Sequence, residues 1–510
     1  MIKSALSSFC LLAFLASAVS FSSDQKLKTL YNSLDPSSIA EHLAYYELYA
    51  PHPLSRQAMA DVYRLLSGEP PLSQNLTELP LSPDVIRSLV NLIIRPNSRE
   101  IAPLEEANLK MIERLSARLS HRRLLGHQAT SEAEVVMLPP AQVDVARGLF
   151  LSQYSQDLQK VRTYEAVIDL MALQVLARLP AQPTPEQKIT KINELIFEEL
   201  QFRFPPHSLH AKDIDTYTFL PSVLDSHRGV CLGVSILYLC LAQRLDLPLE
   251  MITPPGHIYV RYRTAEKTIN IETTARGIHI DSEEYLGVNT RSLQQRNPKE
   301  VIGLAHFNQA SVFWQKGDYE KTYQAYQAAK KYMGEDAQLN ELLGYASLFT
   351  GHEEEGRQLL HQVKYFVSEH AIVGNTMAQD YLEGNVDAES LKLIFAHDEE
   401  DRESLLHKKE VLSDVVKRYP KFRAGLLYLA ATWMELYRSD EALTMLKAYQ
   451  TLTQFDPEAN YQLALLYVQR LNYQKAWEHL RLAEATTHTK DYTPKPLKEL
   501  RKNLATLSPE

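Results

Sequence analysis

The stretch of sequence that organises this chain is HRGVCLGVSILYLCLAQRL, residues 227–245. Its second part, from Val234 to Leu245, is an apolar run with the length of a buried helix. Gly229 stands just before this run and can adopt backbone angles that other residues avoid, so we expect the helix to begin near Cys231. In the first turn of a helix the aligned peptide dipoles favour a thiolate. The pattern therefore makes Cys231 a candidate nucleophile.

The cysteines favour free thiols over a disulfide framework. The chain has three cysteines, and two of them, Cys231 and Cys240, lie in the predicted helix. Nine residues of helix place them on opposite faces with about 13 Å of rise between them. A disulfide needs its two Cα atoms within about 7 Å. We therefore expect at least one free thiol, and we interpret Cys240 as a small buried apolar residue.

Downstream of this helix the apolar pattern changes from helical to alternating. Ile258–Tyr262 and Thr268–Ile271 alternate in side-chain type, are rich in β-favouring residues, and flank the short polar link 264–267. Such a pair of runs predicts a β-hairpin. We expect Ile258, Val260, Ile269 and Ile271 to form its core face, with His257 opening the first strand.

The register of this hairpin brings a second and a third residue to the thiol. If the strands pair symmetrically about the Thr264–Ala265 step, His257 lies opposite Glu272. Directly opposed side chains share a face and lie about 5 Å apart, whereas a slip of one residue would separate them. A carboxylate beside an imidazole fixes its tautomer and stabilises the imidazolium. We therefore predict a catalytic triad of Cys231, His257 and Glu272.

The rest of the chain is predicted to be helical. Residues 24–185 carry apolar positions at a spacing of three to four, with breaks at prolines, and suggest no chemistry. From 301 to 490 the helical pattern repeats, with pairs of small residues 34 positions apart: Gly317 and Gly351, Ala430 and Ala464, Ala442 and Ala476. This period resembles the tetratricopeptide repeat, a helix hairpin whose small residues allow close packing. The two blocks are out of phase, which predicts a degenerate repeat or an inserted helix at about 370–422.

The central residues resemble the transglutaminase-like superfamily, relatives of the papain-type thiol enzymes, and in particular a small bacterial branch often fused to tetratricopeptide repeats. The resemblance covers about 186–285 and is carried by Phe197–Phe202, Val223–Leu224, Arg228–Cys231, Leu237–Leu239, Ala242–Leu245, Pro248–Leu249 and Pro255–Arg261. It implies an α+β, papain-like domain over 186–290, with Cys231 on a central buried helix and His257 on a sheet. The family usually has Asp, often followed by Pro, where this chain has Glu272 and Thr273.

Together these observations predict a mostly α protein: a helical N-terminal domain at 24–185, a transglutaminase-like domain at 186–290, and an α-solenoid of tetratricopeptide-like repeats at 301–490. The resemblance implies a thiol enzyme that cleaves or transfers peptide or amide bonds, with a peptide or protein substrate. The repeats would bind a protein partner. The alternative, which the Glu in place of Asp favours, is an inactive scaffold that mediates protein–protein interactions.

The N-terminal segment predicts where in the cell the protein acts, and the net charge limits the classes of partner that it binds. Lys3 precedes an apolar run at 9–15, and small residues follow at Ala16, Ala18 and Ser20. These features predict a secretory signal peptide at 1–20 and hence an exported protein, periplasmic or secreted, with membrane contact only if the segment is not cleaved. The formal net charge of -9 argues against nucleic acid as a partner, because binding to it requires basic surfaces.

A metal site and an oxyanion donor are the remaining alternatives. His207, His210 and His227 with Cys231 are zinc-ligand types, but nothing in the sequence fixes the loop between 210 and 227 to bring them to one centre. We therefore expect neither a metal nor a cofactor. Tyr217 is a candidate oxyanion donor beside the backbone N–H of Cys231, outside the predicted triad.

Overall fold

The computed structural model describes residues 23–50, 52–68, 100–155, 157–205, 217–395, 401–453, 455–487 and 494–509. The predicted signal peptide at 1–20 lies outside these residues. The chain forms two compact units. An N-terminal unit comprises Met1–Pro96, Pro103–Leu119 and Ala166–Lys191, and a main unit comprises Asn97–Ala102, Ser120–Glu165 and Ile192–Glu510.

The described residues of the N-terminal unit are helical. A side-chain cap begins one of these helices, where Ser38 accepts a hydrogen bond from the Glu41 amide, and a left-handed glycine, Gly68, ends another. Its helices are α2 (Ser23–Asn32), α3 (Ile39–Leu48), α4 (Pro53–Ser67) and α6 (Glu106–Leu115), followed by the 3₁₀ turn η2 (Ser116–Arg118). Two further helices, α9 (Leu158–Ala177) and α10 (Pro185–Asn193), run across the division between the units.

The main unit begins with short helical elements that lead to a buried central helix. The long apolar run of the sequence forms this helix, α12 (Cys231–Arg244), nearly all of whose residues are buried. Before it come η3 (Ser120–Arg123), η4 (Leu125–Gln128), α7 (Glu132–Met137), η5 (Pro140–Gln142), α8 (Val145–Tyr154), the π-helical turn η6 (Glu194–Glu199) and α11 (Leu220–Ser226). Helix α12 carries apolar side chains on all of its faces, and a helix of that composition must be buried on all of them.

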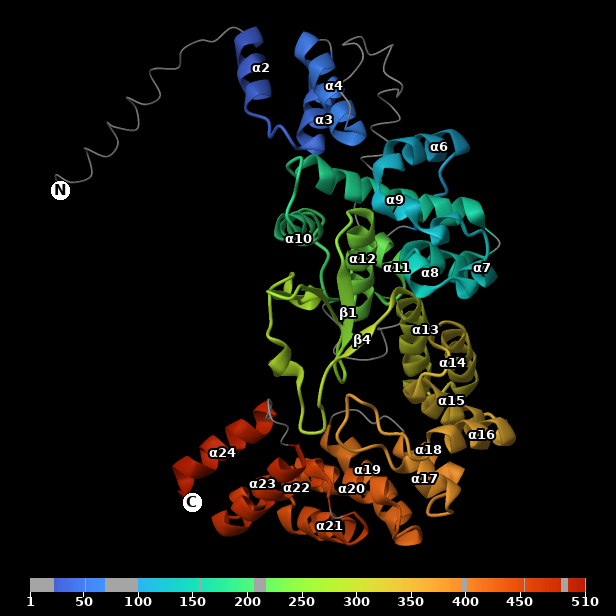
Figure 1. The fold of residues 1–510 in the computed structure, drawn as a ribbon, viewed down its shortest axis with the longest axis vertical. Coiled ribbons are helices and arrows are strands. Elements are labelled where there is room, and N and C mark those ends of the chain that lie inside the picture. The colour runs from blue at the N-terminus through green and yellow to red at the C-terminus, as the bar shows by residue number, and fades with distance from the viewer. Residues whose placement is uncertain are drawn as a thin grey trace, which may run out of the picture. The chain divides into compact units, whose positions relative to one another are not determined.

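A four-stranded antiparallel sheet packs against α12. Its strands are β1 (Leu249–Thr253), β2 (Tyr259–Arg263), β3 (Thr268–Ile271) and β4 (Gln294–Arg296), in the order β3-β2-β1-β4. Helix α12 contacts β1 and β2, and Figure 1 shows it beside β1. The sequence predicted only the β2–β3 hairpin. It missed both β1 and β4; Gln294–Arg296 has no apolar alternation and is a strand only through its pairing with β1.

The predicted hairpin register is wrong by two residues. Val260 pairs with Ile271, and Tyr262 with Ile269, whereas the predicted symmetry paired 258 with 271. The turn centres one step later than expected, because the Thr264 amide donates to the Lys267 carbonyl and closes the whole polar link. Side chains alternate with a period of two, so a shift of two residues leaves every side chain on its predicted face.

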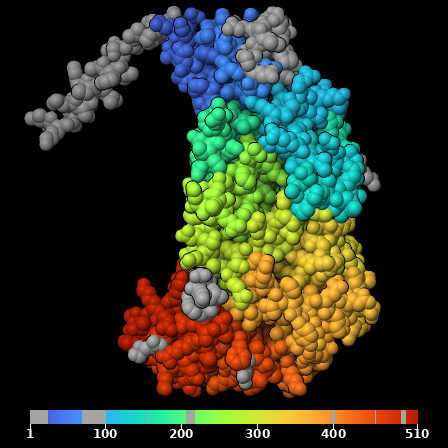
Figure 2. All heavy atoms as spheres, in the orientation of Figure 1, coloured from blue at the N-terminus to red at the C-terminus, as the bar shows by residue number. Residues whose placement is uncertain are grey.

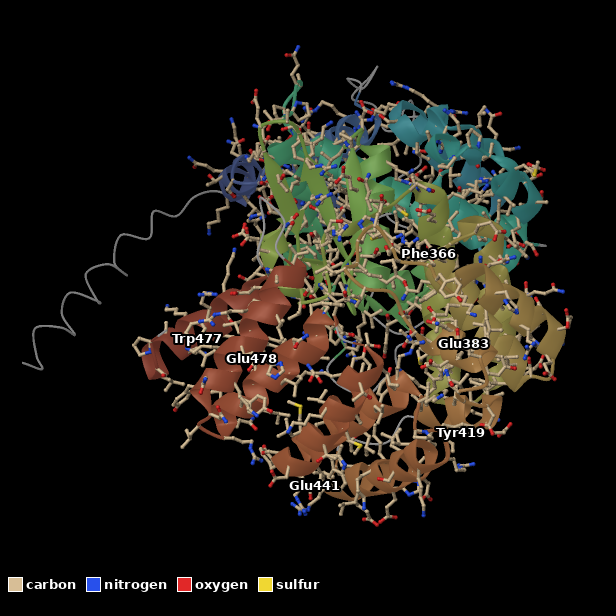
Figure 3. The ribbon with its side chains drawn as sticks, turned by 60° about the horizontal axis from the view of Figure 1, so that its bottom comes forward. Phe366, Glu383, Tyr419, Glu441, Trp477 and Glu478 are labelled. Atoms are coloured by element: carbon tan, nitrogen blue, oxygen red, sulfur yellow. The ribbon has the colours of Figure 1, made fainter. Side chains whose placement is uncertain are left out.

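The C-terminal half of the main unit is built from helix hairpins (Figure 1), and Figure 2 shows the atoms of this half in yellow to red. The first block comprises α13 (Pro298–Gln315), α14 (Tyr319–Met333), α15 (Ala337–Phe349) and α16 (Glu353–Val363). The second comprises α20 (Arg423–Glu435), α21 (Ser439–Leu452), α22 (Pro457–Gln469) and α23 (Tyr473–Thr487), followed by α24 (Lys495–Leu507). Between the blocks lie two short helices, α17 (Met377–Leu382) and α18 (Ala388–Ile394), and the longer α19 (Arg402–Arg418). Figure 3 marks the second block by Glu441 on α21 and Trp477 on α23.

The 34-residue period of the sequence is the period of these hairpins. Helix α14 begins at Tyr319 and α16 at Glu353, 34 residues later; α20 and α22 begin at Arg423 and Pro457, again 34 apart. The paired alanines all lie at helix–helix contacts with no exposed surface: Ala430, Ala442, Ala464 and Ala476. Gly317 and Gly351 occupy turns with positive φ. Within the described residues, no helix combines the length and the apolar character needed to cross a bilayer.

Candidate thiol site

Cys231 is the first residue of α12, and its thiol is free and partly exposed. The predicted role of Gly229 is wrong, because the left-handed residue of this turn is His227, at φ 52°. Gly229 is instead required by packing, since a Cβ there would lie 2.6 Å from Cγ2 of Val234. Cys240 is free and fully buried on the same helix, and burial raises the pKa of its thiol. The two thiols therefore have the separate environments that helix geometry predicts.

His257 lies in the loop that leads into β2. A turn at Pro254–Gly256 precedes it, with Gly256 at φ 71° and the His257 amide donating to the Pro254 carbonyl at 3.1 Å. Its Nε2 lies 2.5 Å from Oε2 of Glu272. The hairpin register explains this contact. Continued by one pair, the register places Tyr259 opposite Glu272, so His257 is the diagonal neighbour of Glu272 on the same face.

Glu272 follows β3 directly and caps the short 3₁₀ helix η8 (Thr273–Ala275). One carboxylate oxygen, Oε1, accepts hydrogen bonds from the Thr274 amide at 3.1 Å and from the Thr274 hydroxyl at 2.7 Å. The other, Oε2, is shared between His257 and the hydroxyl of Tyr285, which donates at 2.6 Å. The side chain is 4% exposed, so four hydrogen bonds hold this carboxylate in a largely dry position.

The electrostatics of the pair favour a charged imidazole. Burial raises the pKa of Glu272, but hydrogen bonds from His257, Tyr285 and Thr274 outweigh burial and lower it to about 2. Burial lowers the pKa of His257, but hydrogen bonds with Cys231 and Glu272 outweigh burial and raise it to about 9. At neutral pH the pair is therefore an imidazolium beside a carboxylate. Because Nε2 faces Glu272, Nδ1 is the ring nitrogen left for Cys231.

Tyr285 is a residue of the site that the sequence did not reveal. It ends the 3₁₀ helix η9 (Ser282–Tyr285), and its ring stacks on His257 with the ring centroids 5.4 Å apart and an interplanar angle of 14°. It also stacks on Tyr259, at 5.0 Å. The sequence around Tyr285 shows no periodic pattern of apolar residues. Tyr285 reaches Glu272 only because the chain folds back after β3. The one available signal was an aromatic residue shortly after the predicted hairpin.

A cleft of about 1100 Å³ opens over the thiol. One wall carries Cys231, His257 and Tyr285, and α13 adds Phe307 and Asn308. The repeat array supplies further lining residues, among them Glu458, Lys495 and Glu499 from α22 and α24. The cleft is therefore lined by residues from both the sheet region and the repeats of the same chain, and it has the size of a ligand site.

The other residues considered from the sequence have separate places. His227 is buried, its Nδ1 lies 2.9 Å from the Leu200 carbonyl, and its ring stacks on Phe202, so it packs the core. His207 and His210 lie outside the described residues. Tyr217 contributes its backbone, since its carbonyl accepts from the Val230 amide at 3.3 Å. Its side chain is not among those that line the cleft.

One group in the described part of the chain has the residue types of a metal site. The ligand atoms of His121, His127 and Asp144 lie within 4.8 Å of one another. Arg122 lies 3.0 Å from Nε2 of His127, and Nη1 of Arg244 lies 4.0 Å from Oδ1 of Asp144. Two guanidinium groups therefore already provide positive charge at this point, which disfavours a divalent cation. We interpret the group as an ion-pair network that packs the end of α12.

A family model described as the transglutaminase-like superfamily matches residues 162–308, which include Cys231, His257, Glu272 and Tyr285. This part of the chain is a transglutaminase-like domain. The match extends on both sides of the predicted interval 186–290, and the boundaries predicted from the sequence stay predictions. Comparison with curated proteins gives no match.

Several solved structures resemble part of the chain. A tetratricopeptide-repeat protein from Thermus thermophilus is 19% identical, with 40% of this chain and 98% of that chain covered and a TM-score of 0.22. MamA from Desulfovibrio magneticus is 14% identical over 37% and 97% of the two chains, with a TM-score of 0.19. PilW, a type IV pilus biogenesis factor, is 14% identical over 40% and 84%, with a TM-score of 0.21. The C-terminal helices are tetratricopeptide-type repeats, as their 34-residue spacing indicates.

Proposed function

We propose that the transglutaminase-like domain is a thiol enzyme that cleaves or transfers peptide or amide bonds. Cys231 is the nucleophile, His257 the proton carrier, and Glu272 the group that orients His257. The observation that carries this proposal is the bond between Nε2 of His257 and Glu272, in a cleft that Cys231 and His257 both line. This is the nucleophile, base and orienting-acid arrangement of acyl transfer.

The proposed reaction uses the proton that His257 holds. The Cys231 thiolate attacks the carbonyl carbon, and the carbonyl oxygen takes up the displaced electron pair. Collapse of this intermediate expels the amine, which receives the proton from His257, and leaves a thioester on Cys231. Water, or a second amine, then attacks the thioester carbonyl while His257 accepts its proton. The carbon–sulfur bond breaks, the acid or the new amide leaves, and the Cys231 thiolate and the His257 imidazolium are restored. The helix start at Cys231 supplies backbone N–H groups toward the oxyanion.

The cleft and the repeats support a peptide or protein substrate. The cleft is large enough for several residues of polypeptide, and the repeat array contributes part of its lining. Helix hairpins stacked in an array present an extended surface that suits peptide or protein partners. We propose that the repeats bind such a partner, and that the protein acts after export, on the basis of the charged start and the apolar run of residues 1–20.

Alkylation of Cys231 by iodoacetamide at pH 7 tests the proposal, with labelling located by mass spectrometry. We expect Cys231 to react at least ten times faster in the wild type than in His257→Ala, because the imidazolium stabilises the thiolate. Cys240 serves as an internal control, since it is buried and should stay unlabelled in both proteins. Slow labelling that His257→Ala does not change would overturn the thiol enzyme and favour the inactive scaffold. Substrate profiling of the wild type against Cys231→Ala would then define the bond cleaved.

A further inference from the structure

The segment 282–292 joins the thiol site to the repeat array. At its start, Tyr285 donates its hydroxyl to Glu272 at 2.6 Å and stacks on His257. The start is also fixed to the sheet, since Ser282 Oγ lies 3.2 Å from the Tyr259 hydroxyl and accepts from the Asn270 amide group at 3.0 Å. Removing Tyr285 would therefore remove one of the four hydrogen bonds that hold Glu272.

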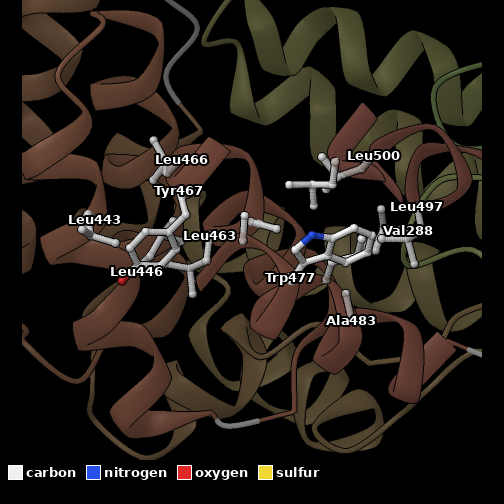
Figure 4. Packing of buried hydrophobic residues seen from close by; sticks show 14 of the residues in the cluster. Val288, Leu443, Leu446, Leu463, Leu466, Tyr467, Trp477, Ala483, Leu497 and Leu500 are labelled. Carbon is white, nitrogen blue, oxygen red and sulfur yellow. The ribbon is translucent and has the colours of Figure 1, made fainter. Parts of the chain in front are cut away.

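Three residues after Tyr285, the same segment enters the core of the repeat array. Val288 is 3% exposed and belongs to the apolar cluster of the second repeat block and α24. Figure 4 shows it beside Leu497 and Trp477, with Leu500 close by. Burying a valine side chain removes apolar surface from water, which favours this contact. The array therefore holds this segment through its own core.

The second half of the segment is paired with the stretch between α16 and α17. Thr290 forms an antiparallel bridge with Ala371, and the Arg291 amide donates to the His370 carbonyl at 2.8 Å. The Asn289 side chain accepts from the Val373 amide at 2.8 Å, and Ser292 Oγ lies 2.7 Å from Nδ1 of His370. Segment 282–292 is thus held by the array at Val288 and again at 289–292.

Two ion pairs add a third attachment. Glu284 pairs with Lys495, and Glu283 lies 3.7 Å from Lys498, both lysines belonging to α24. These side chains are 40% to 63% exposed, and exposed pairs contribute little stability. The pairs therefore add little, and Val288 and the backbone contacts carry the attachment. Glu283 and Glu284 are also the direct chain neighbours of Tyr285.

We propose that segment 282–292 couples the repeat array to the thiol site, with Tyr285 as the positioning residue that transmits the coupling. The array fixes the segment, the segment fixes Tyr285, and Tyr285 fixes the carboxylate that orients His257. A protein partner that changes the packing of the second repeat block then changes the reactivity of Cys231. This inference rests on the proposed thiol chemistry and adds its regulation.

A double-mutant cycle on the full chain tests the coupling, with the rate and the pH dependence of Cys231 alkylation as readouts. Tyr285→Phe keeps the stacked ring and removes the donor to Glu272, and Val288→Asp places a charge in the apolar cluster. We expect each to slow alkylation at pH 7 by about tenfold, the effect of losing one hydrogen bond to a charged group. In the Tyr285→Phe background, Val288→Asp should slow the alkylation of Cys231 further by less than about twofold.

The matched control is Leu471→Asp, on the turn between α22 and α23. Leu471 is 72% exposed and has a φ of 55°, which Asp tolerates, so this variant adds a charge to the same array without entering its core. It should leave both the rate and the pH profile unchanged, whereas Tyr285→Phe should shift the pH midpoint. If Val288→Asp does not fold, as judged by circular dichroism, Val288→Ala replaces it with a smaller effect in the same direction.

The outcomes separate this inference from the proposed function. Equal slowing by Val288→Asp in the wild-type and Tyr285→Phe backgrounds would mean that the array does not act through Tyr285, and would overturn the coupling. Unchanged rates in both variants, with His257→Ala still slow, would overturn the coupling and leave the thiol enzyme standing. Only a rate that His257→Ala fails to change would count against the thiol enzyme itself.

Discussion

The repeat array and the thiol site differ in whether their defining residues recur at a fixed period along the chain. In the array, each helix hairpin packs on its neighbour, and equivalent residues recur every 34 positions, as at Ala430 and Ala464. In the thiol site, a helix start, a loop, a strand end and a 3₁₀ helix each contribute one side chain. Repeating local contacts leave a trace in the sequence, whereas converging contacts become visible only after folding.

The sharpest test of this difference removes the nucleophile. Cys231→Ala should abolish turnover of any amide substrate, by more than about 10³-fold, because the covalent step has no other nucleophile. The thermal unfolding midpoint should move little, since the side chain is small and partly exposed. Cys240→Ala is the matched control at a buried position of the same helix. It should retain activity, and loss of activity in Cys240→Ala alone would contradict the assignment.

The next largest effect concerns the orienting carboxylate. Glu272→Gln removes the charge that holds the His257 proton, so the pKa of His257 should fall from about 9 toward its ordinary value of 6.5. We expect turnover to drop roughly 10²- to 10⁴-fold, measured at pH 7 with the substrate that profiling identifies. Glu272→Asp, the residue usual in the family, keeps the charge and should lose much less. Equal loss in both variants would show that geometry rather than charge governs this position.

A matched change in the array should act on stability. Ala346→Leu overpacks a fully buried position on α15 and should lower the free energy of unfolding by about 1–3 kcal/mol, measured by urea denaturation. Ala505→Leu makes the same change at an exposed position of α24 and should be nearly neutral. A neutral Ala346→Leu would mean that close helix packing does not set the stability of the array.

The smallest expected effect is a pH dependence of stability from His257 and Glu272. The folded pKa of His257 is raised from 6.5 to about 9, so its contribution is complete below pH 6.5 and is lost as the pH rises toward 9. The folded pKa of Glu272 is lowered from 4.5 to about 2, so its contribution is present above pH 4.5 and is lost as the pH falls toward 2.

The two contributions overlap between about pH 4.5 and 6.5. Unfolding measured from about pH 2 to about pH 9 should show that the stability advantage of the wild type over the double variant His257→Ala/Glu272→Gln is largest in this range and falls toward both ends. A difference between the two proteins that stays constant with pH would mean that the pair is not coupled to folding.

Much of the site was nevertheless predictable, for identifiable physical reasons. Cys231 stood at the head of an apolar run, and helix starts are marked by local sequence. His257 and Glu272 were predicted to be neighbours from a register that proved wrong by two residues, yet they do meet. The predicted contact between His257 and Glu272 is present because strand side chains alternate with a period of two, so a shift of two residues keeps them on the same face. An error of one residue would have placed Glu272 on the opposite face.

Other features could not be predicted because no local pattern encodes them. Strand β4 depends on pairing with β1, and Gly229 is needed for the close approach of Val234 rather than for its own backbone angle. Tyr285 reaches Glu272 through a turn that folds back after β3. Each of these features depends on a contact between two segments, and the composition of neither segment alone indicates that contact.

The amino-acid pattern alone was enough to specify the helices, the 34-residue repeat and the face on which each hairpin side chain lies, because these depend on periods of 3.6, 34 and 2 residues along the chain. Tertiary packing was needed to specify that the repeats line the thiol cleft, that Val288 enters their core and that Tyr285 bonds Glu272. These contacts join segments that share no sequence period, so their free energy depends on the folded arrangement of the whole unit.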